Sequence, residues 1–347
     1  MPTPLPPLAD VRRLLIVKTS AIGDVIHALP VVQAIKDAAP GLTLDWVVRA
    51  RSADVLRGNP AIDTLRVLPD KPSLGDLLAL RRELYAARYD MALDMQGLAL
   101  SGLVTALSGA PVRLGWDRGR EGNRLFLTHP LVPGKGPVRY EIDLLYGFAE
   151  ALGVYTAHPE FTPQPYLAAG GAAKAAAWLQ SLPHPRVALN VGASRAYKRW
   201  PAERWGEVAQ GLAEGGAGLV FIGDKTDAAV VSTLVPMLAG GSFVDLAGQT
   251  TLRELASVLA ACDLLVSGDS GPMHLAVAVG TPAVALFGAT DPRRHGPYGR
   301  RNVVLHDPAP GAMVPGKRPT EDAGAASLAR LTPAQVLAAV RDITNYA

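Results

Sequence analysis

The sequence predicts an α/β protein made of two similar domains, each a doubly wound parallel sheet flanked by helices. Its 347 residues exceed what one hydrophobic core usually serves, which favours two domains. In both halves, short apolar runs alternate with longer helical patterns, as in repeated βαβ units. Each half also has a junction where an apolar strand meets small polar residues and then a helix, at residues 14–27 and 264–276. Open parallel sheets bind anionic ligands at such junctions, so we expect the two domains to face one cleft.

The first half predicts alternating strands and helices followed by a linker. Strands are expected at residues 13–17, 43–48, 64–68, 90–94 and 112–115, and helices at 25–38, 73–88, 97–108 and 140–152. Residues 153–170, with three prolines within 158–165, indicate an extended linker. The first domain is therefore placed at residues 1–165.

The second half repeats the alternation. Strands are expected at 186–191, 218–222, 243–245, 263–267 and 282–286, and helices at 171–181, 202–214, 225–239, 251–261 and 271–279. Residues 307–326 are rich in Pro, Gly and Ala and indicate a loop, after which Thr332 caps a last helix with Pro333 at its first position. The second domain is placed at 166–330, and the helix of 331–347 is a candidate to pack back on the first domain.

Composition excludes several classes of protein. A net charge of +3 lacks the strongly basic balance typical of nucleic-acid partners. The single cysteine, Cys262, permits no intrachain disulfide and reads as a small buried hydrophobe, which suits a reducing compartment. The N-terminus lacks the layout of a signal peptide, and no apolar run is long enough to span a bilayer. These features predict a cytoplasmic protein and leave peripheral contact with the inner membrane surface open.

Asp24 is the candidate catalytic residue of the first junction. It follows Gly23 at the tip of the loop, directly before an apolar helix. One interpretation makes it the helix N-cap, a purely structural role. The other makes it a general base that takes a proton from an acceptor hydroxyl. Lys18 and Ser20 of the same loop are then placed to hold the acceptor or a phosphate.

The second junction, residues 268–274, is the candidate phosphate loop. Helix amides at 270–272 and the Ser270 hydroxyl suit a diphosphate. Asp269 suits a phosphate site poorly and is better explained as an acceptor for sugar hydroxyls or as a loop brace. His274 lies one turn into the helix, where a packed histidine is at least as expected as a ligand contact.

Two further loops follow strands of the second half. In residues 192–201, Lys198 is placed to neutralise a leaving phosphate, although a lone lysine is usually solvated surface. In residues 223–227, polar side chains are able to hydrogen-bond a base or ribose. The sequence has no G-x-G-x-x-G after the first strand, no Walker loop, no zinc-ligand spacing and no Asp-x-Asp after an apolar strand, so no cofactor or metal is expected.

Five ordered motifs resemble glycosyltransferase family 9, the ADP-heptose heptosyltransferases of lipopolysaccharide core synthesis. They are residues 16–30, residues 94–98, Trp116 with Arg120-Glu121, Lys198-Arg199-Trp200-Pro201, and residues 267–274. The resemblance implies a GT-B fold with an acceptor-binding first domain and a nucleotide-sugar-binding second domain. It also implies inverting, metal-independent transfer with Asp24 as general base.

The resemblance assigns roles to individual residues as well. Lys198 joins Asp24 as a catalytic residue. The donor side comprises Ser194, Thr226, Asp227, Asp269, Ser270, Gly271 and His274, and the acceptor side comprises Lys18, Ser20, Gln96 and Arg120. The partners implied are ADP-heptose and a glycolipid or oligosaccharide acceptor.

Three positions depart from the family pattern on the acceptor side. Leu100 stands where many members have Lys, and Arg139 and Asp143 replace a His and an Arg. The stretch 113–139 still carries six Arg/Lys against two acids, so basic groups remain available for an anionic acceptor.

From the motifs together we predict heptosyl transfer to a sugar hydroxyl of a lipopolysaccharide core or related glycolipid. The alternatives are a same-family transferase with another donor sugar, a nucleotide-sugar epimerase of similar fold, and a non-catalytic binder.

Overall fold

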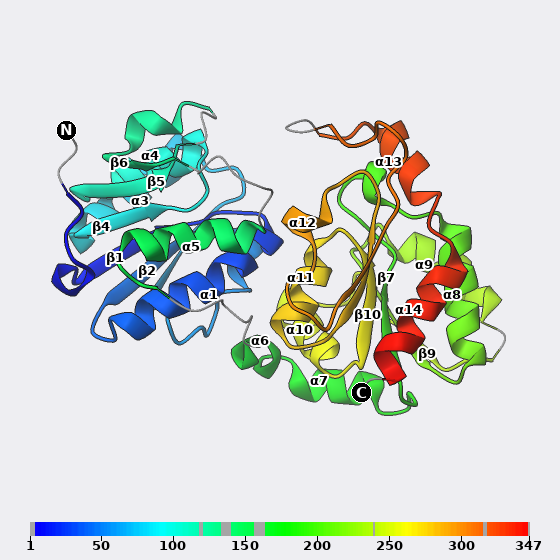
Figure 1. Ribbon diagram of the computed structural model, residues 1–347. Helices are drawn as coiled ribbons and strands as arrows, with labels where there is room; N and C mark the ends of the chain where they lie inside the picture. The colour runs from blue at the N-terminus through cyan, green and yellow to red at the C-terminus, as the bar shows by residue number, and fades with distance from the viewer. Residues whose placement is uncertain are drawn as a thin grey trace. The chain divides into compact units, whose positions relative to one another are not determined.

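The computed structural model describes residues 4–117, 121–132, 140–155, 164–238, 240–314 and 318–345. The chain divides into two compact units, Met1–Pro159 and Glu160–Ala347 (Figure 1). Each unit contains a parallel six-stranded sheet with helices on both faces. No helix among the described residues is long and apolar enough to cross a membrane.

The first unit has the strand order β3-β2-β1-β4-β5-β6. Its strands are β1 (Arg13–Val17), β2 (Thr43–Arg49), β3 (Thr64–Leu68), β4 (Met91–Asp94), β5 (Val112–Trp116) and β6 (His129–Leu131). The order changes direction between β1 and β4, so the loops after these two strands meet at the carboxyl edge of the sheet.

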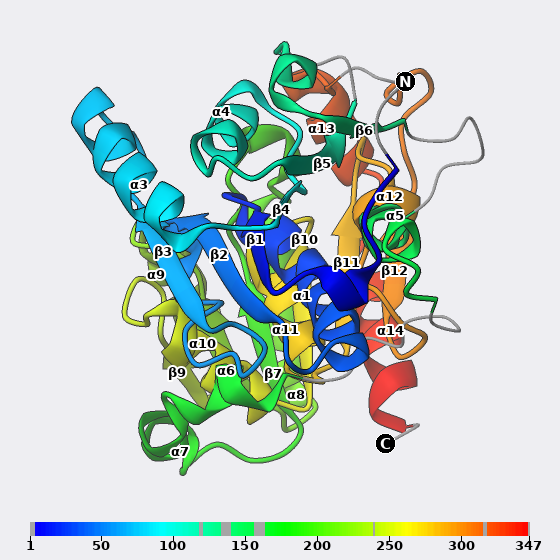
Figure 2. The same cartoon turned by 90° about the vertical axis from the view of Figure 1, so that its left-hand side faces the viewer.

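Helices cover both faces of this sheet. One face carries α1 (Ile22–Ala38) and α5 (Glu141–Ala151), and the other carries α3 (Leu74–Ala87) and α4 (Ala99–Leu107) (Figure 2). The short elements are η1 (Leu8–Asp10), α2 (Ala50–Ala53) and η2 (Asn123–Phe126). Because both faces are covered, β1 is apolar from Leu14 to Val17, and these four residues are fully buried.

The second unit has the equivalent order, β12-β11-β10-β7-β8-β9. Its strands are β7 (Arg186–Asn190), β8 (Gly218–Ile222), β9 (Phe243–Asp245), β10 (Leu264–Gly268), β11 (Ala283–Phe287) and β12 (Val303–His306). Here the order changes direction between β7 and β10. The loops that follow these strands therefore lie side by side.

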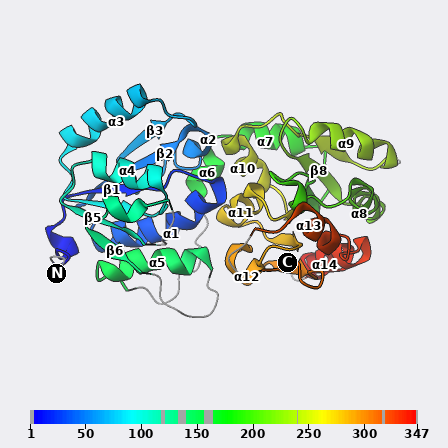
Figure 3. The same cartoon turned by 90° about the horizontal axis from the view of Figure 1, so that it is seen from above.

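The helices of the second unit also form two layers (Figure 3). One face carries α8 (Ala202–Glu214), α9 (Ala228–Leu234) with η4 (Val235–Met237), and α14 (Pro333–Asn345); the other carries α10 (Leu252–Ala260) and α11 (Gly271–Ala278). Two helices, α6 (Pro165–Ala169) and α7 (Ala172–Leu179), pack against α10. The remaining elements are η3 (Ala196–Lys198), α12 (Pro292–His295) and α13 (Glu321–Leu328).

The last helix, α14, belongs to the core of the second unit. Val336, Ala339 and Val340 are buried in the same cluster as residues of β7, β8 and α8. Thr332 and Pro333 start this helix as predicted, with the Thr332 hydroxyl accepting the Gln335 amide. The apolar face of α14 is thus buried within the second unit. The packing on the first domain that the sequence raised stays a prediction.

Several elements of the structure were not predicted correctly. Edge strands β6 and β12 were missed because they are short and only half-buried, so they lack long apolar runs. Helix α6 lies where we expected linker, because Pro165 is tolerated at its first helical position. Helix α13 lies partly in the predicted loop 307–326, where Thr320 caps it. Residues 156–163 of the predicted linker lie outside the described residues.

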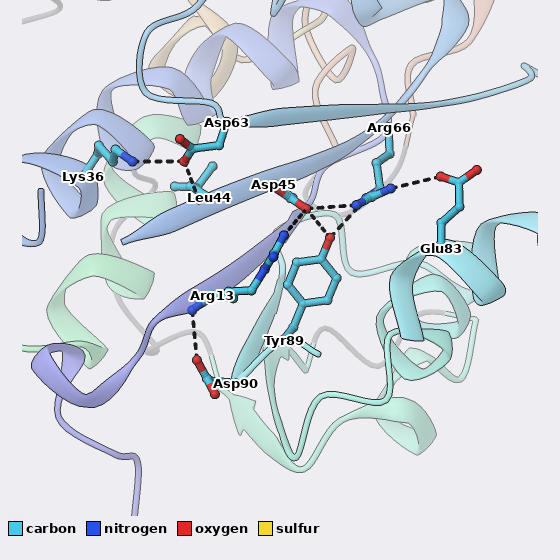
Figure 4. Close-up of polar contacts among 9 residues, drawn as sticks. All are labelled: Arg13, Lys36, Leu44, Asp45, Asp63, Arg66, Glu83, Tyr89 and Asp90. Carbon is cyan, nitrogen blue, oxygen red and sulfur yellow. Dashed lines mark hydrogen bonds and ion pairs between the residues drawn. The ribbon is translucent and has the colours of Figure 1, made fainter. Parts of the chain in front are cut away.

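A buried carboxylate in β2 connects neighbouring strands of the first sheet near their amino ends (Figure 4). Asp45 Oδ2 accepts hydrogen bonds from Tyr89 at 2.5 Å, Arg66 at 3.2 Å and Arg13 at 3.4 Å. Arg66 also pairs with Glu83 of α3 at 3.0 Å. Burial and the neighbouring Asp45 charge raise the pKa of Tyr89. The cluster fixes α3 to the sheet, near the strand starts and away from the carboxyl edge.

Candidate functional site

The β1 loop of the first unit is fixed by residues of the β4 loop. Lys18 is only 2% exposed, and its Nζ donates to the Met95 carbonyl at 3.1 Å. Gln96 Oε1 accepts hydrogen bonds from the backbone amides of Thr19 and Ser20, both at 3.1 Å. In this structure Lys18 and Gln96 therefore shape the loop, whereas the sequence placed both on the acceptor.

Asp94, the last residue of β4, orients Gln96. Its Oδ1 accepts the amides of Gln96 at 3.1 Å and Gly97 at 2.9 Å. Burial raises the pKa of the Asp94 carboxyl, and those two amides oppose the rise. Sequence reasoning gave this residue no role. The signal that marks it is a carboxylate at the end of an apolar strand beside the switch point.

Asp24 lies on the first turn of α1 as its third residue, and not at the N-cap. The N-cap is Ala21, whose backbone amide donates to Asp24 Oδ2 at 3.0 Å. The other oxygen, Oδ1, makes no hydrogen bond with any described residue. The structural and catalytic interpretations are thus compatible, because one oxygen holds the loop and the second is available to accept a proton.

The remaining acceptor-side residues divide by position. Ser20 is half-buried in the β1 loop. Arg120 and Arg139 lie outside the described residues. The neighbouring Glu121 accepts the Ala99 amide at 3.1 Å, at the start of α4. Its carboxylate therefore complements the positive end of that helix.

In the second unit, an ion pair joins the two loops at the switch point. Lys198 Nζ lies 2.6 Å from Asp269 Oδ2, with side-chain exposures of 20% and 8%. Gly268 gives the loops room, since a Cβ there would lie 3.1 Å from the Lys198 carbonyl. The structure thus brings together two predicted site residues that are 71 positions apart in the sequence. It also supports the brace interpretation of Asp269.

Asn190, which sequence reasoning missed, organises the same loops. This buried last residue of β7 has its Nδ2 within donating distance of the hydroxyls of Ser267 and Ser270, both at 2.9 Å, and of the Gly192 carbonyl at 3.1 Å. The signal is again a polar residue ending an apolar strand at the switch point, as at Asp94.

Helix α11 begins at this cluster with Ser270 as its N-cap residue. The Ser270 hydroxyl bonds within the cluster and makes no capping bond to the helix. Pro272 has no backbone N–H, so the predicted amide donors at 270–272 reduce to Ser270 and Gly271, with Met273 the next available. His274 is buried on the first turn, which fits the packed interpretation.

The β8 loop is built around two carboxylates. Asp224 Oδ1 accepts the Thr226 hydroxyl at 2.6 Å, and this bond lowers the Asp224 pKa. The buried Asp227 accepts the Asp224 amide at 2.9 Å, and burial raises the Asp227 pKa. Its carboxylate fills the space beside Gly192, where a Cβ would overlap Asp227 Oδ2.

The outer part of the β7 loop is open to solvent. Ser194 is exposed and makes no hydrogen bond through its side chain with the described part of the chain. Arg199 lies beside it, donating to the Ala193 carbonyl at 3.0 Å and lying 3.7 Å from Asp227 Oδ1. The described ranges hold no group of three or more His, Cys, Asp or Glu that could bind a metal.

Comparisons with known proteins identify the family of this chain. The model of glycosyltransferase family 9 (heptosyltransferase) matches residues 77–315. The chain belongs to this family. Lipopolysaccharide heptosyltransferase 1 of Escherichia coli K12 is 31% identical over 316 residues, which cover 85% of this chain and 94% of that protein.

Solved structures extend the likeness to the fold. E. coli heptosyltransferase WaaC with ADP matches with a TM-score of 0.73 at 28% identity, over 95% of this chain and 99% of that chain. A family 9 glycosyltransferase from Veillonella parvula matches with a TM-score of 0.79 at 24% identity, over 98% and 99% of the two chains. The predicted family, the GT-B fold and the glycosyltransferase class of this enzyme are confirmed. The shared cleft and the residue roles stay predictions.

Proposed function

We propose that this enzyme transfers a heptosyl group from ADP-heptose to a sugar hydroxyl of a lipopolysaccharide core, inverting the anomeric centre without a metal. The observation that carries the proposal is the Lys198–Asp269 pair beside Ser270 and the start of α11, at the switch point of the second sheet. Two relatives support these substrates. E. coli lipopolysaccharide heptosyltransferase 1 supports the reaction, and the structures of WaaC with ADP and with ADP-2-deoxy-2-fluoro heptose support the donor.

The second unit binds the donor in this proposal. The diphosphate lies against Lys198 and the first amides of α11, where an ammonium and the positive helix end stabilise the charge that develops on the leaving ADP. Asp269 keeps Lys198 oriented and accepts hydrogen bonds from hydroxyl groups of the heptose. Thr226, Asp227 and Ser194 line the part of the edge that receives the nucleoside.

The first unit binds the acceptor and supplies the base. Oδ1 of Asp24 takes the proton of the attacking hydroxyl while the oxygen attacks the anomeric carbon from the face opposite ADP. The C–O bond to ADP breaks as the new glycosidic bond forms, and the product is inverted. Ser20, Arg120 and the basic stretch 113–139 contact the acceptor. A nucleotide-sugar donor and a free buried Cys262 favour a cytoplasmic enzyme.

Calorimetric titration with ADP, UDP and GDP, in EDTA and then in magnesium, tests the donor half. We expect ADP to bind best, with equal affinity in both conditions, and Lys198→Ala to weaken it at least tenfold. Arg341→Ala removes an exposed cation elsewhere in the second unit and should leave binding unchanged. Preference for UDP or GDP, or magnesium-dependent binding, would contradict the proposal.

The base is tested by transfer assays with Asp24→Asn. The amide keeps an oxygen for the Ala21 N–H but cannot accept the acceptor proton, so kcat should fall by about 10² to 10⁴ while ADP affinity stays that of the wild type. Asp37→Asn, at an exposed carboxylate further along α1, serves as the control. Full turnover by Asp24→Asn would remove Asp24 from the chemistry.

A further inference from the structure

Helix α3 presents an exposed apolar face in addition to the face that packs on the sheet. Leu80 and Leu84 are buried against the first sheet, with Leu77 and Ala87 beside them. On the other side Leu74, Leu78 and Tyr85 are 73%, 48% and 66% exposed. At 3.6 residues per turn these three lie within about 40° of one another around the helix axis. Figure 2 shows α3 projecting from the unit beside β3.

The same face is cationic. Around the helix axis Arg81 and Arg82 lie on either side of these three residues, so the whole face spans about 100°. Both arginines are exposed, and neither forms an ion pair or a side-chain hydrogen bond within the described ranges. We call Leu74, Leu78, Arg81, Arg82 and Tyr85 the α3 stripe.

The acidic residues of α3 lie on the opposite side of the helix, and both have partners there. Asp76 accepts the Ser73 hydroxyl at 2.6 Å and the Ser73 amide at 2.8 Å, at the helix start. Glu83 pairs with Arg66 of β3 (Figure 4). The stripe therefore combines two leucines, a tyrosine and two exposed arginines that have no acidic partner among the described residues. That combination on one helix is typical of binding to an anionic lipid surface.

We propose that the α3 stripe binds the enzyme to an anionic lipid surface. Leu74, Leu78 and Tyr85 enter the headgroup boundary while Arg81 and Arg82 contact lipid phosphates. Helix α3 begins just after the carboxyl end of β3, the same sheet edge that carries the Asp24 loop. The stripe runs from that edge, at Leu74, toward the strand starts, at Tyr85, so binding lays helix α3 along the lipid. The inference rests on the proposed function only in taking the acceptor to be a glycolipid of such a surface.

Vesicle sedimentation of the full chain tests the proposal. Wild type should bind vesicles of phosphatidylglycerol and phosphatidylcholine, and bind pure phosphatidylcholine far more weakly. An arginine near an anionic surface is worth about fivefold in partitioning, so Arg81→Glu with Arg82→Glu should lower it at least tenfold. Leu74→Ser with Tyr85→Ser should lower it by a similar factor.

Matched controls come from exposed residues outside the stripe. Tyr155→Ser removes an 80% exposed tyrosine of the first unit, and Arg341→Glu reverses an exposed arginine of the second unit. Both should bind vesicles as the wild type does. Equal binding to both vesicle types, unchanged binding of the stripe variants, or no binding by the wild type would overturn the proposal.

Light scattering and ADP titration distinguish lipid binding from a protein interface and from a failure of the donor site. If Leu74→Ser with Tyr85→Ser converts an oligomer into monomers in light scattering, the stripe is a protein interface and the lipid proposal is wrong. ADP titration of each stripe variant should match the wild type, because α3 belongs to the first unit. Loss of ADP binding by the wild type would count against the proposed donor and leave the lipid result standing.

Discussion

At the residue scale, Gln96 is predicted to position the Asp24 loop. Its single Oε1 holds the amides of Thr19 and Ser20, and Ala21 follows them with its amide on Asp24. Gln96→Ala removes this support, and a displacement of about 1 Å costs about a hundredfold in kcat. Gln96→Glu keeps an acceptor for both amides and should recover most of that loss. If Gln96 instead contacts the acceptor, Gln96→Ala should change the acceptor KM and Gln96→Glu should not rescue it.

Gly192 gives a second residue-scale prediction. Gly192→Ala places a methyl group in the space of the buried Asp227 carboxylate, so the β8 loop must move. We expect a loss of about 1–3 kcal/mol in the free energy of unfolding, measured by urea denaturation, together with weaker ADP binding. Gly41→Ala is the control, because a Cβ there meets nothing within 4 Å. Wild-type stability and ADP affinity in the Gly192→Ala variant would show that the β8 loop moves aside at little cost in free energy.

The candidate site was only partly predictable from the sequence. Loop placement followed from strand ends, so Lys198 and Asp269 were found although their contact was not. The direction of a side chain is not encoded locally: Lys18 reads as a free cation in a loop, yet it lies buried on the Met95 carbonyl. Asn190 reads as the end of a strand, and its partners Ser267 and Ser270 are 77 and 80 residues away.

At the element scale, Glu254 connects α10 to α7. It accepts the Thr251 amide at 2.8 Å at the start of α10 and pairs with Lys174 of α7 at 2.5 Å. The Lys174 ammonium, aided by that amide, lowers the pKa of Glu254 from 4.5 to about 2. Because the folded value is the lower one, the charge stabilises the fold above about pH 4.5, and this stabilisation is lost as pH falls toward 2.

Glu254→Gln tests this linkage because it keeps the capping acceptor and removes the charge. The variant should lose up to about 1 kcal/mol of unfolding free energy at pH 7 and match the wild type near pH 2 in urea denaturation. Glu203→Gln, on the exposed first turn of α8, is the matched control. A deficit that persists unchanged in acid would assign the effect to packing of α10 and not to its charge.

Elements were predictable where burial alone dictates the pattern. Strand β1 and strand β8 are apolar on both faces because helices cover both sides, and their predicted bounds match. Strand β6 is the reverse case: His129-Pro130-Leu131 has a proline without an N–H, which an edge strand tolerates because one side needs no partner. Strand β6 forms because it pairs with β5, so its own sequence hardly indicates a strand.

At the scale of the whole molecule, each unit has its own sheet and core, which predicts that the second unit folds alone. Its first helices are part of it: the Ser257 hydroxyl of α10 donates to the Ala168 carbonyl of α6 at 2.5 Å, and Glu254 pairs with α7. A fragment starting at Glu160 should therefore unfold cooperatively and bind ADP with an affinity close to that of the full chain. A fragment starting at Leu182 lacks α6 and α7, exposes α10, and should unfold more easily. Calorimetry and urea denaturation of both fragments check this, and a well-folded first fragment that fails to bind ADP would mean that the first unit supplies part of the nucleotide site.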